Sequence, residues 1–254
     1  MFGRRVMNRL TYSCCCDIGR LRKENQDNYI CDGNFLSPGE SGSEIAPSQT
    51  VLTDRAALFG VFDGLGGEEC GEVASLIAAK NASALNGQKC TESKLHEYCM
   101  RTNSEICRYV DDHGISSMGT TAAILAFTKS SVILCNIGDS KVFRLSKDKF
   151  EQLSEDHYCK TFFGKKPPLS QCLGIPETEI IIEPYIQTFD YENGDIFLIC
   201  TDGLTDMVDN QTIQTIIRSG PFETAAKALM STALYNGGKD NVTLVICKLN
   251  KSYF

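Results

Sequence analysis

The chain has 254 residues, of which 42% are hydrophobic and 22% are charged, and its formal net charge is −7. These proportions are typical of a soluble globular protein with an apolar core, and an acidic surface repels nucleic acid and anionic lipid, which excludes both as favoured partners. No apolar run reaches the roughly 18 residues of a membrane-spanning helix. No signal-peptide core follows the basic N-terminus, so we expect a cytoplasmic protein without a membrane partner.

Thirteen cysteines and three histidines bound the chemistry further. Many cysteines lie inside apolar runs, as Cys135, Cys200 and Cys247 do, which favours reduced and buried thiols over a disulfide framework or a zinc site. The histidines lie on unrelated segments, so a histidine-rich metal site is not expected.

The first half of the chain predicts two strands and then two helices. A short strand is predicted around 29–32, and Ser, Gly and Pro then predict a surface loop over Leu36–Thr50. The apolar run 56–63 predicts a second strand. Apolar residues at helical spacing predict helices over 72–85 and 92–112.

The second half predicts strands in a run and then helices in a run. Short strand-like segments, separated by polar turns, are typical of an antiparallel meander, and a last strand closes the chain. This grouping predicts an α+β protein rather than a parallel βαβ sheet. The strands are predicted over 119–128, 131–140, 141–147, 149–154, 195–203 and 241–249, and the helices over 210–220 and 221–238.

Five aspartates lie beside Gly or Asn at the ends of apolar runs: Asp27, Asp63, Asp139, Asp202 and Asp240. A half-buried carboxylate is costly unless a positive charge neutralises it, and no matching set of buried Arg or Lys is apparent. Hard oxygen ligands suit Mg²⁺ or Mn²⁺, and neighbouring glycines let backbone carbonyls approach a metal. Asp beside Gly or Asn is also common turn chemistry, so the pattern alone leaves both interpretations open.

Six blocks occur in this order along the chain: DIGRLRKENQDNY, LFGVFDGLGGEECGEVAS, MGTTAAILAF, CNIGDSKVFRLSKDKFEQLSEDH, GDIFLICTDGLTDMV and GGKDNVTLVIC. They resemble the metal-dependent protein serine/threonine phosphatases, the PPM or type 2C family, and especially its compact bacterial members. The resemblance covers about residues 12–249, and it implies a single catalytic domain over 1–254 with a short, basic flap at about 158–184. It also implies a four-layer α-β-β-α sandwich, in which two mostly antiparallel sheets carry helices on their outer faces.

The resemblance also implies two divalent cations, Mg²⁺ or Mn²⁺, in a cleft between the sheets, with room for a looser third ion. Such a pair acidifies a water for attack on phosphorus. By motif position, the ligands are Asp63, which bridges both ions, the Gly64 carbonyl, Asp202 and Asp240, Asp27 in part through water, and Asp139 at the third ion.

Arg22 lies five residues before Asp27, where the family places its phosphate-binding arginine. A guanidinium can hold two phosphate oxygens at once, whereas a lysine cannot. The alternative is an exposed surface charge beside Arg20 and Lys23.

Two positions depart from the family pattern. Gln26 replaces a glutamate that normally contacts a metal-bound water, so metal affinity is expected to be lower. Leu65 stands where eukaryotic members often have a histidine, whereas bacterial members commonly have an apolar residue at this position.

We therefore expect a monomeric, metal-dependent phosphatase that removes phosphate from Ser and Thr of proteins and that opposes a Ser/Thr kinase. One alternative is a catalytically weak pseudophosphatase that binds phosphoproteins as a scaffold. Another keeps the hydrolase but directs it to a small phosphate ester or to one specific regulator.

Overall fold

The computed structural model describes residues 6–65, 70–147, 149–160 and 167–253. In chain order, its elements are β1 (Val6–Asp17), β2 (Asn28–Cys31), β3 (Gly42–Val51), β4 (Ala57–Phe62), β5 (Gly64–Leu65), α1 (Gly71–Ser83), α2 (Glu92–His113), β6 (Gly119–Thr120), β7 (Ala122–Phe127), β8 (Val132–Ile137), β9 (Lys141–Leu145), β10 (Phe150–Gln152), β11 (Tyr185–Phe189), β12 (Ile196–Cys200), α3 (Asp202–Thr205), α4 (Asn210–Ser219), α5 (Phe222–Tyr235) and β13 (Val242–Tyr253).

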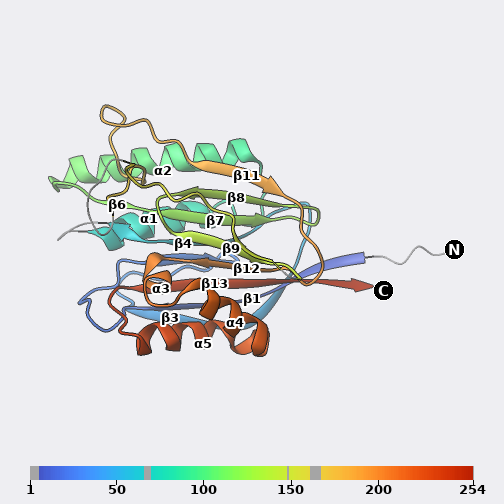
Figure 1. Ribbon diagram of the computed structural model, residues 1–254. Helices are drawn as coiled ribbons and strands as arrows, with labels where there is room; N and C mark the ends of the chain where they lie inside the picture. Colours follow the sequence, from blue (N-terminus) through green and yellow to red (C-terminus); the bar gives the residue numbers. More distant parts are fainter. Residues whose placement is uncertain (1–5, 66–69, 148, 161–166, 254) are drawn as a thin grey trace.

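These elements form four layers (Figure 1). One sheet has the strand order β10-β9-β12-β13-β1-β3, the other has the order β11-β8-β7-β4-β2, and β5 pairs with β6. Every strand pairing is antiparallel. Helices α1 and α2 cover the outer face of the second sheet, and α4 and α5 cover that of the first (Figure 1). The predicted α+β sandwich is confirmed.

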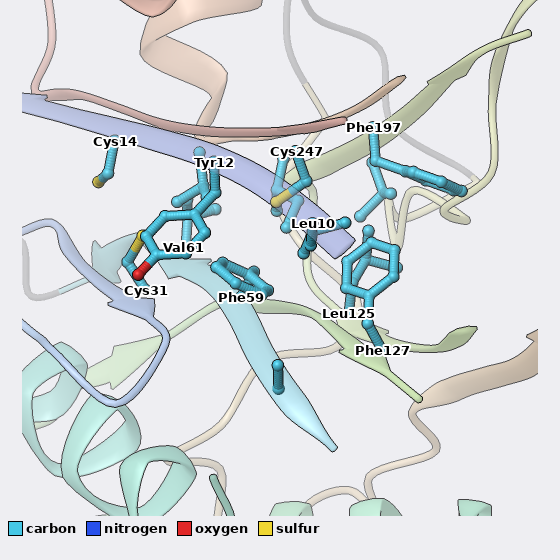
Figure 2. Close-up of a cluster of buried hydrophobic side chains, with 14 of the residues drawn as sticks. Leu10, Tyr12, Cys14, Cys31, Phe59, Val61, Leu125, Phe127, Phe197 and Cys247 are labelled. Atoms are coloured by element: carbon cyan, nitrogen blue, oxygen red, sulfur yellow. The ribbon is translucent and has the colours of Figure 1, made fainter. Parts of the chain in front are cut away.

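The core between the sheets is built largely from aromatic and branched side chains (Figure 2). Tyr12 of β1 packs on Phe59 of β4, with ring centroids 5.0 Å apart. Phe127 of β7 joins Phe59 to Phe197 of β12, with centroid distances of 5.9 Å and 5.3 Å. These contacts fix the two sheets face to face, because aromatic rings bury large areas and prefer such tilted arrangements.

Two outer cores attach the helices. Helix α1 presents Ala74, Ala78 and Ala82 to the sheet at four-residue spacing, and all three are fully buried. Strand β4 is buried on both faces, which explains why its sequence is a continuous apolar run without alternation. Among the described residues, no helix has both the length and the apolar character that crossing a membrane requires.

The surface loop predicted over Leu36–Thr50 is wrong from residue 42 onward. Strand β3 occupies that segment and pairs with β1 at the edge of the sheet. The register shifts between Tyr12 and Cys14, where Pro47 has no paired partner. An edge position and a bulge both tolerate a proline, so turn-like composition concealed a strand. Strands β1 and β11 were also not predicted.

The pairing of β1 with β13 brings distant segments together. It runs without interruption from Val6 opposite Tyr253 to Asp17 opposite Val242. The chain that leaves β1 therefore lies beside the chain that enters β13, and the Arg20 N–H donates to the Gly238 carbonyl at 2.7 Å. This arrangement places residues 18–27 next to residues 238–241, although more than 200 positions separate them in the sequence.

We expect Gly60→Ala to lower the free energy of unfolding by about 1–3 kcal/mol, because overpacking forces the backbone to shift. A Cβ at Gly60 would lie 2.6 Å from the Ala123 carbonyl oxygen in the neighbouring strand. Urea unfolding measures the change. Gly220→Ala is the matched control, since the nearest atom to its Cβ is at 3.6 Å. Equal losses in the two variants would contradict this packing of β4 against β7.

Candidate active site

A cleft of about 350 Å³ opens between loops from both sheets. It gathers four of the five predicted aspartates, together with Gly64 and Arg22. The described residues that line it are Arg22, Gln26, Asp63, Gly64, Leu65, Asp139, Pro167, Pro168, Leu169, Asp202, Asp240 and Asn241.

The five-stranded sheet contributes three of the aspartates. Asp27 immediately precedes β2, Asp63 follows β4, and Asp139 follows β8 by two residues. Asp63 is held through its backbone, because its N–H donates to Thr121 Oγ1 at 3.0 Å and its carbonyl accepts from the Thr121 N–H at 2.9 Å. The buried strand β4 therefore delivers this carboxylate to the cleft in a fixed position.

The six-stranded sheet contributes the other two. Asp202 begins α3 directly after β12, and Asp240 lies two residues before β13. Gly203, which follows Asp202, lies against Asn241, which follows Asp240. A Cβ on this glycine would lie 1.9 Å from the Asn241 carbonyl oxygen. The glycine thus allows the two loops to touch.

Asp27 is buried behind the cleft, with 3% of its surface exposed, and it lines an adjoining cavity instead. The Thr201 hydroxyl donates to its Oδ2 at 2.9 Å. The pKa of Asp27 is raised to about 7, chiefly by burial; the charges of Asp202 and Asp240 contribute to the rise, and the hydrogen bonds that Asp27 accepts oppose it.

Asp63 is the electrostatic centre of the group. Burial raises the pKa of Asp63 well above its ordinary value, and the carboxylates of Asp27, Asp202, Asp139 and Asp240 each raise it further. The structure therefore places the other four predicted aspartates close enough to Asp63 to act on its carboxyl group.

Arg22 lies at the rim of the cleft, where its Nη2 donates to Asp240 Oδ2 at 2.6 Å. This hydrogen bond raises the pKa of the Arg22 guanidinium. Its side chain is 52% exposed, so donors remain available to a ligand. Among the described residues that line the cleft, Arg22 is the only basic one.

Asn241 is a structural residue of the site that sequence reasoning missed. Its Nδ2 donates to the carbonyls of Ile18 and Glu24 at 2.9 Å and 3.0 Å, and its Oδ1 accepts from the Gln26 N–H at 2.9 Å. One buried amide thus holds the segment that carries Arg22 and Asp27. The pair Asp240–Asn241 before a strand indicated a turn or a metal-ligating Asp240, and it assigned no role to Asn241.

Gln26 is packed against Gly64, the residue that follows Asp63. The Gly64 N–H donates to the Gln26 carbonyl at 3.1 Å, and a Cβ at Gly64 would lie 2.3 Å from that same oxygen. The Gln26 side chain lies against Gly71, where a Cβ would come within 2.9 Å of its Cδ. Only glycine fits at position 64, which is the position predicted to offer its carbonyl to a metal.

The segment after β10 borders the cleft. Pro167, Pro168 and Leu169 line it, and the Tyr158 hydroxyl donates to Asp139 Oδ2 at 3.0 Å. Of the lysines that make this segment basic, Lys165 and Lys166 lie outside the described residues.

The residues of the cleft fit a hard divalent cation. In the described part of the chain, no three Asp, Glu, His or Cys side chains form a compact metal-binding group, and the carboxylates instead surround the cleft. Two observations favour a cation. The pKa values of the buried Asp27 and the partly exposed Asp63 are raised by desolvation and by neighbouring acids, and one rim arginine cannot neutralise five carboxylates. The donors are oxygens, which suit Mg²⁺ or Mn²⁺.

Comparison with known proteins places the chain in a family. A sequence profile described as protein phosphatase 2C matches residues 47–237. The chain belongs to the protein phosphatase 2C family, and the expected enzyme class, a protein serine/threonine phosphatase, is confirmed.

Relatives extend the likeness over almost the whole chain. The serine/threonine phosphatase stp of Listeria innocua is 28% identical, with 92% of this chain and 94% of the relative covered. The protein phosphatase PhpP of Streptococcus pneumoniae is also 28% identical, with coverages of 94% and 97%.

Solved structures share the fold. The serine/threonine phosphatase PstP/Ppp of Mycobacterium tuberculosis superimposes with a TM-score of 0.79 at 25% identity, covering 95% of this chain and 99% of that one. The catalytic domain of PstP in complex with two manganese ions gives a TM-score of 0.76 at 24% identity, covering 97% and 100%.

We expect Asn241→Ala to lower the free energy of unfolding by about 2–4 kcal/mol, because it leaves three backbone groups without their partner. The matched control is Asn236→Ala, which removes one exposed hydrogen bond, to the Met207 carbonyl. Urea unfolding of both variants measures the difference. A loss in Asn241→Ala no larger than in the control would show that the amide does not hold residues 18–26.

Proposed function

We propose that this protein hydrolyses phosphoserine and phosphothreonine in other proteins at a divalent-metal centre in the cleft. The observation that carries the proposal is the convergence of four aspartates from two sheets on one cleft that has an arginine at its rim, with the buried Asp27 near Asp63. Membership of the protein phosphatase 2C family supports it, as do relatives named serine/threonine phosphatases.

The proposed ligands are Asp27, Asp63, Asp139, Asp202 and Asp240, with the Gly64 carbonyl. When bound, Mg²⁺ or Mn²⁺ ions supply Lewis-acid activation of water and offset negative charge on the phosphoryl oxygens. The relative that was solved with two manganese ions supports a centre of two ions, and Asp139 is the proposed ligand of a third. Asp63 lies among the other four and is the proposed bridging ligand.

Arg22 is the proposed phosphate-binding residue. Asp240 accepts one of its hydrogen bonds and so orients the guanidinium toward the cleft. The remaining N–H donors can take two phosphate oxygens in parallel. Leu65 has no proton to give to the leaving oxygen. None of the described lining residues is His, Lys or Tyr, so we propose that solvent in the open cleft supplies that proton.

The proposal extends to the setting of the enzyme. We propose that residues 1–254 form one catalytic domain, with 158–184 as a short flap, and that the enzyme is a cytoplasmic monomer that opposes a Ser/Thr kinase. Described large apolar side chains that are exposed are few, and only Ile180 and Ile181 among them are neighbours in the sequence, which supports a monomer. They are Leu21, Val51, Ile180, Ile181 and Tyr235. The pseudophosphatase alternative finds no support among the relatives, which are named phosphatases.

The function is tested by phosphate release from a phosphothreonine peptide. We expect release with Mn²⁺, loss of release with EDTA, and recovery when Mn²⁺ is restored, while a phosphotyrosine peptide releases far less. Asp63→Asn should abolish release and weaken Mn²⁺ binding in isothermal titration, because a bridging charge is removed.

Asp190→Asn is the control for that variant. Asp190 follows the end of β11 that pairs with Val132, and Asn136, near Asp139, pairs with the other end of β11. It should bind Mn²⁺ and turn over as the unchanged protein does. Release that survives EDTA, or an Asp63→Asn protein with undiminished turnover, would contradict the metal centre. Phosphopeptide binding without any release would favour the scaffold.

We expect Arg22→Ala to raise KM for the phosphopeptide by about tenfold or more, with a smaller change in kcat, because a charge-assisted pair to phosphate is lost. Arg22→Lys should recover only part of the loss, since it cannot bind two oxygens side by side. Lys23→Ala is the control, because Lys23 is an exposed neighbouring cation that does not line the cleft. Equal KM changes in Arg22→Ala and Lys23→Ala would mean that only general surface charge matters.

A further inference from the structure

A second cavity, of about 750 Å³, adjoins the cleft, and Leu65 lines both of them. Its walls are the C-terminal half of α2, the residues that lead into β6, and the segment 172–179. We call it the Leu65 pocket. An extended chain advances about 3.3–3.6 Å per residue. A phosphorylated residue in the cleft therefore places its own sequence neighbours within reach of this pocket.

The wall formed by residues 173–175 is fixed before any ligand arrives. The buried Asn103 of α2 donates to the Ile175 carbonyl at 2.9 Å and accepts from the N–H groups of Gly174 and Ile175 at 2.7 Å and 3.1 Å. On the other side, Leu173 and Thr120 exchange two backbone hydrogen bonds of 2.9 Å. A preformed wall costs little ordering on binding, so it can discriminate between ligands.

Gly174 is required for this close packing. Its φ of +106° is left-handed, and a Cβ would lie 2.4 Å from the Met118 carbonyl oxygen. Met118 and Ile175 line the pocket, together with Val110 of α2. The interior of the pocket is therefore suited to an apolar side chain.

The rim of the pocket is acidic. Asp111 and Glu179 line it, and Glu177 lies beside it in a shallower depression shared with Asp111. Burial is the largest cause that raises the pKa of the half-buried Cys107 thiol, and the charges of Asp111, Glu177 and Glu179 raise it further. All three carboxylates therefore lie near this thiol. Arg108 is the one cation among the described residues that line that depression.

These three carboxylates are available to a ligand. In the described part of the chain none of them takes part in an ion pair. The rim is therefore net negative, and its complement is a Lys or Arg side chain. An apolar interior and a negative rim together define what can bind.

We propose that the Leu65 pocket binds the substrate segment next to the phosphorylated residue and selects an apolar side chain that is flanked by Lys or Arg. This proposal rests on the proposed phosphatase function and names its substrate class. Asp111 and Glu179 are specificity-determining residues that touch the flanking segment and not the phosphoryl group.

The test uses short phosphothreonine peptides with Mn²⁺ and the full chain. In one set a Leu–Lys pair is moved along both sides of the phosphothreonine, and in the matched set the pair is Leu–Glu. At the position that reaches the pocket, kcat/KM should be about fivefold higher for Leu–Lys than for Leu–Glu. The double variant Asp111→Asn, Glu179→Gln should bring this ratio near one, and Glu179→Lys should reverse it.

Asp112→Asn is the matched control, because Asp112 is an exposed neighbour on α2 that does not line the pocket. It should keep the ratio of the unchanged protein. A ratio near one at every position, or a ratio that the double variant retains, would overturn the proposal, as would equal loss in the control. Hydrolysis of p-nitrophenyl phosphate by the unchanged protein separates the outcomes, since its absence would refute the phosphatase function itself.

Discussion

Repulsion among five carboxylates is the constraint on which the rest of this structure depends. Asp63 lies within the field of four other aspartates, and Asp27 is almost fully buried. Such a group would separate if its loops were free, because each charge is costly to bury without a partner. The two sheets prevent this separation. Their aromatic core holds them face to face, so the loops at the ends of their strands cannot move apart.

The loops themselves are held by neutral polar groups. Thr121 fixes the backbone of Asp63, Thr201 donates to Asp27, and Asn241 binds three backbone groups of the segment that carries Arg22. Neutral donors stabilise carboxylates without cancelling their charge. The cleft therefore keeps a negative field that a divalent cation can satisfy, and one arginine at its rim remains available to an anion.

The sequence predicts the parts of this protein that depend on local pattern and on family motifs. The helices at 72–85 and 92–112 agree with α1 and α2 within one or two residues, because their apolar spacing is regular. The motifs drew attention to the five aspartates, four of which line the cleft, and their role as metal ligands stays a prediction. Edge strand β3 was missed, because edge strands tolerate Ser, Gly and Pro.

Long-range partners could not be predicted. The role of Asn241 depends on carbonyls more than 200 residues away, and no sequence pattern near Asp240 and Asn241 indicates these partners. The acidic rim near Leu65 likewise joins Asp111 of α2 to Glu179 of a loop, and it exists only after folding. Spacing reveals which side chains share a face, whereas contacts between distant loops depend on how the sheets are stacked.

The uninterrupted pairing of β1 with β13 has a consequence for biosynthesis. Strand β13 lies between β12 and β1, and Asp240 comes just before it. While the ribosome still holds residues 242–253, the first-made strand lacks its central neighbour, and the partner of Arg22 is not yet in place. A nascent chain emerges N-terminus first. The pairing of β1 and the contact between Arg22 and Asp240 therefore form only after residues 240–253 have left the ribosome.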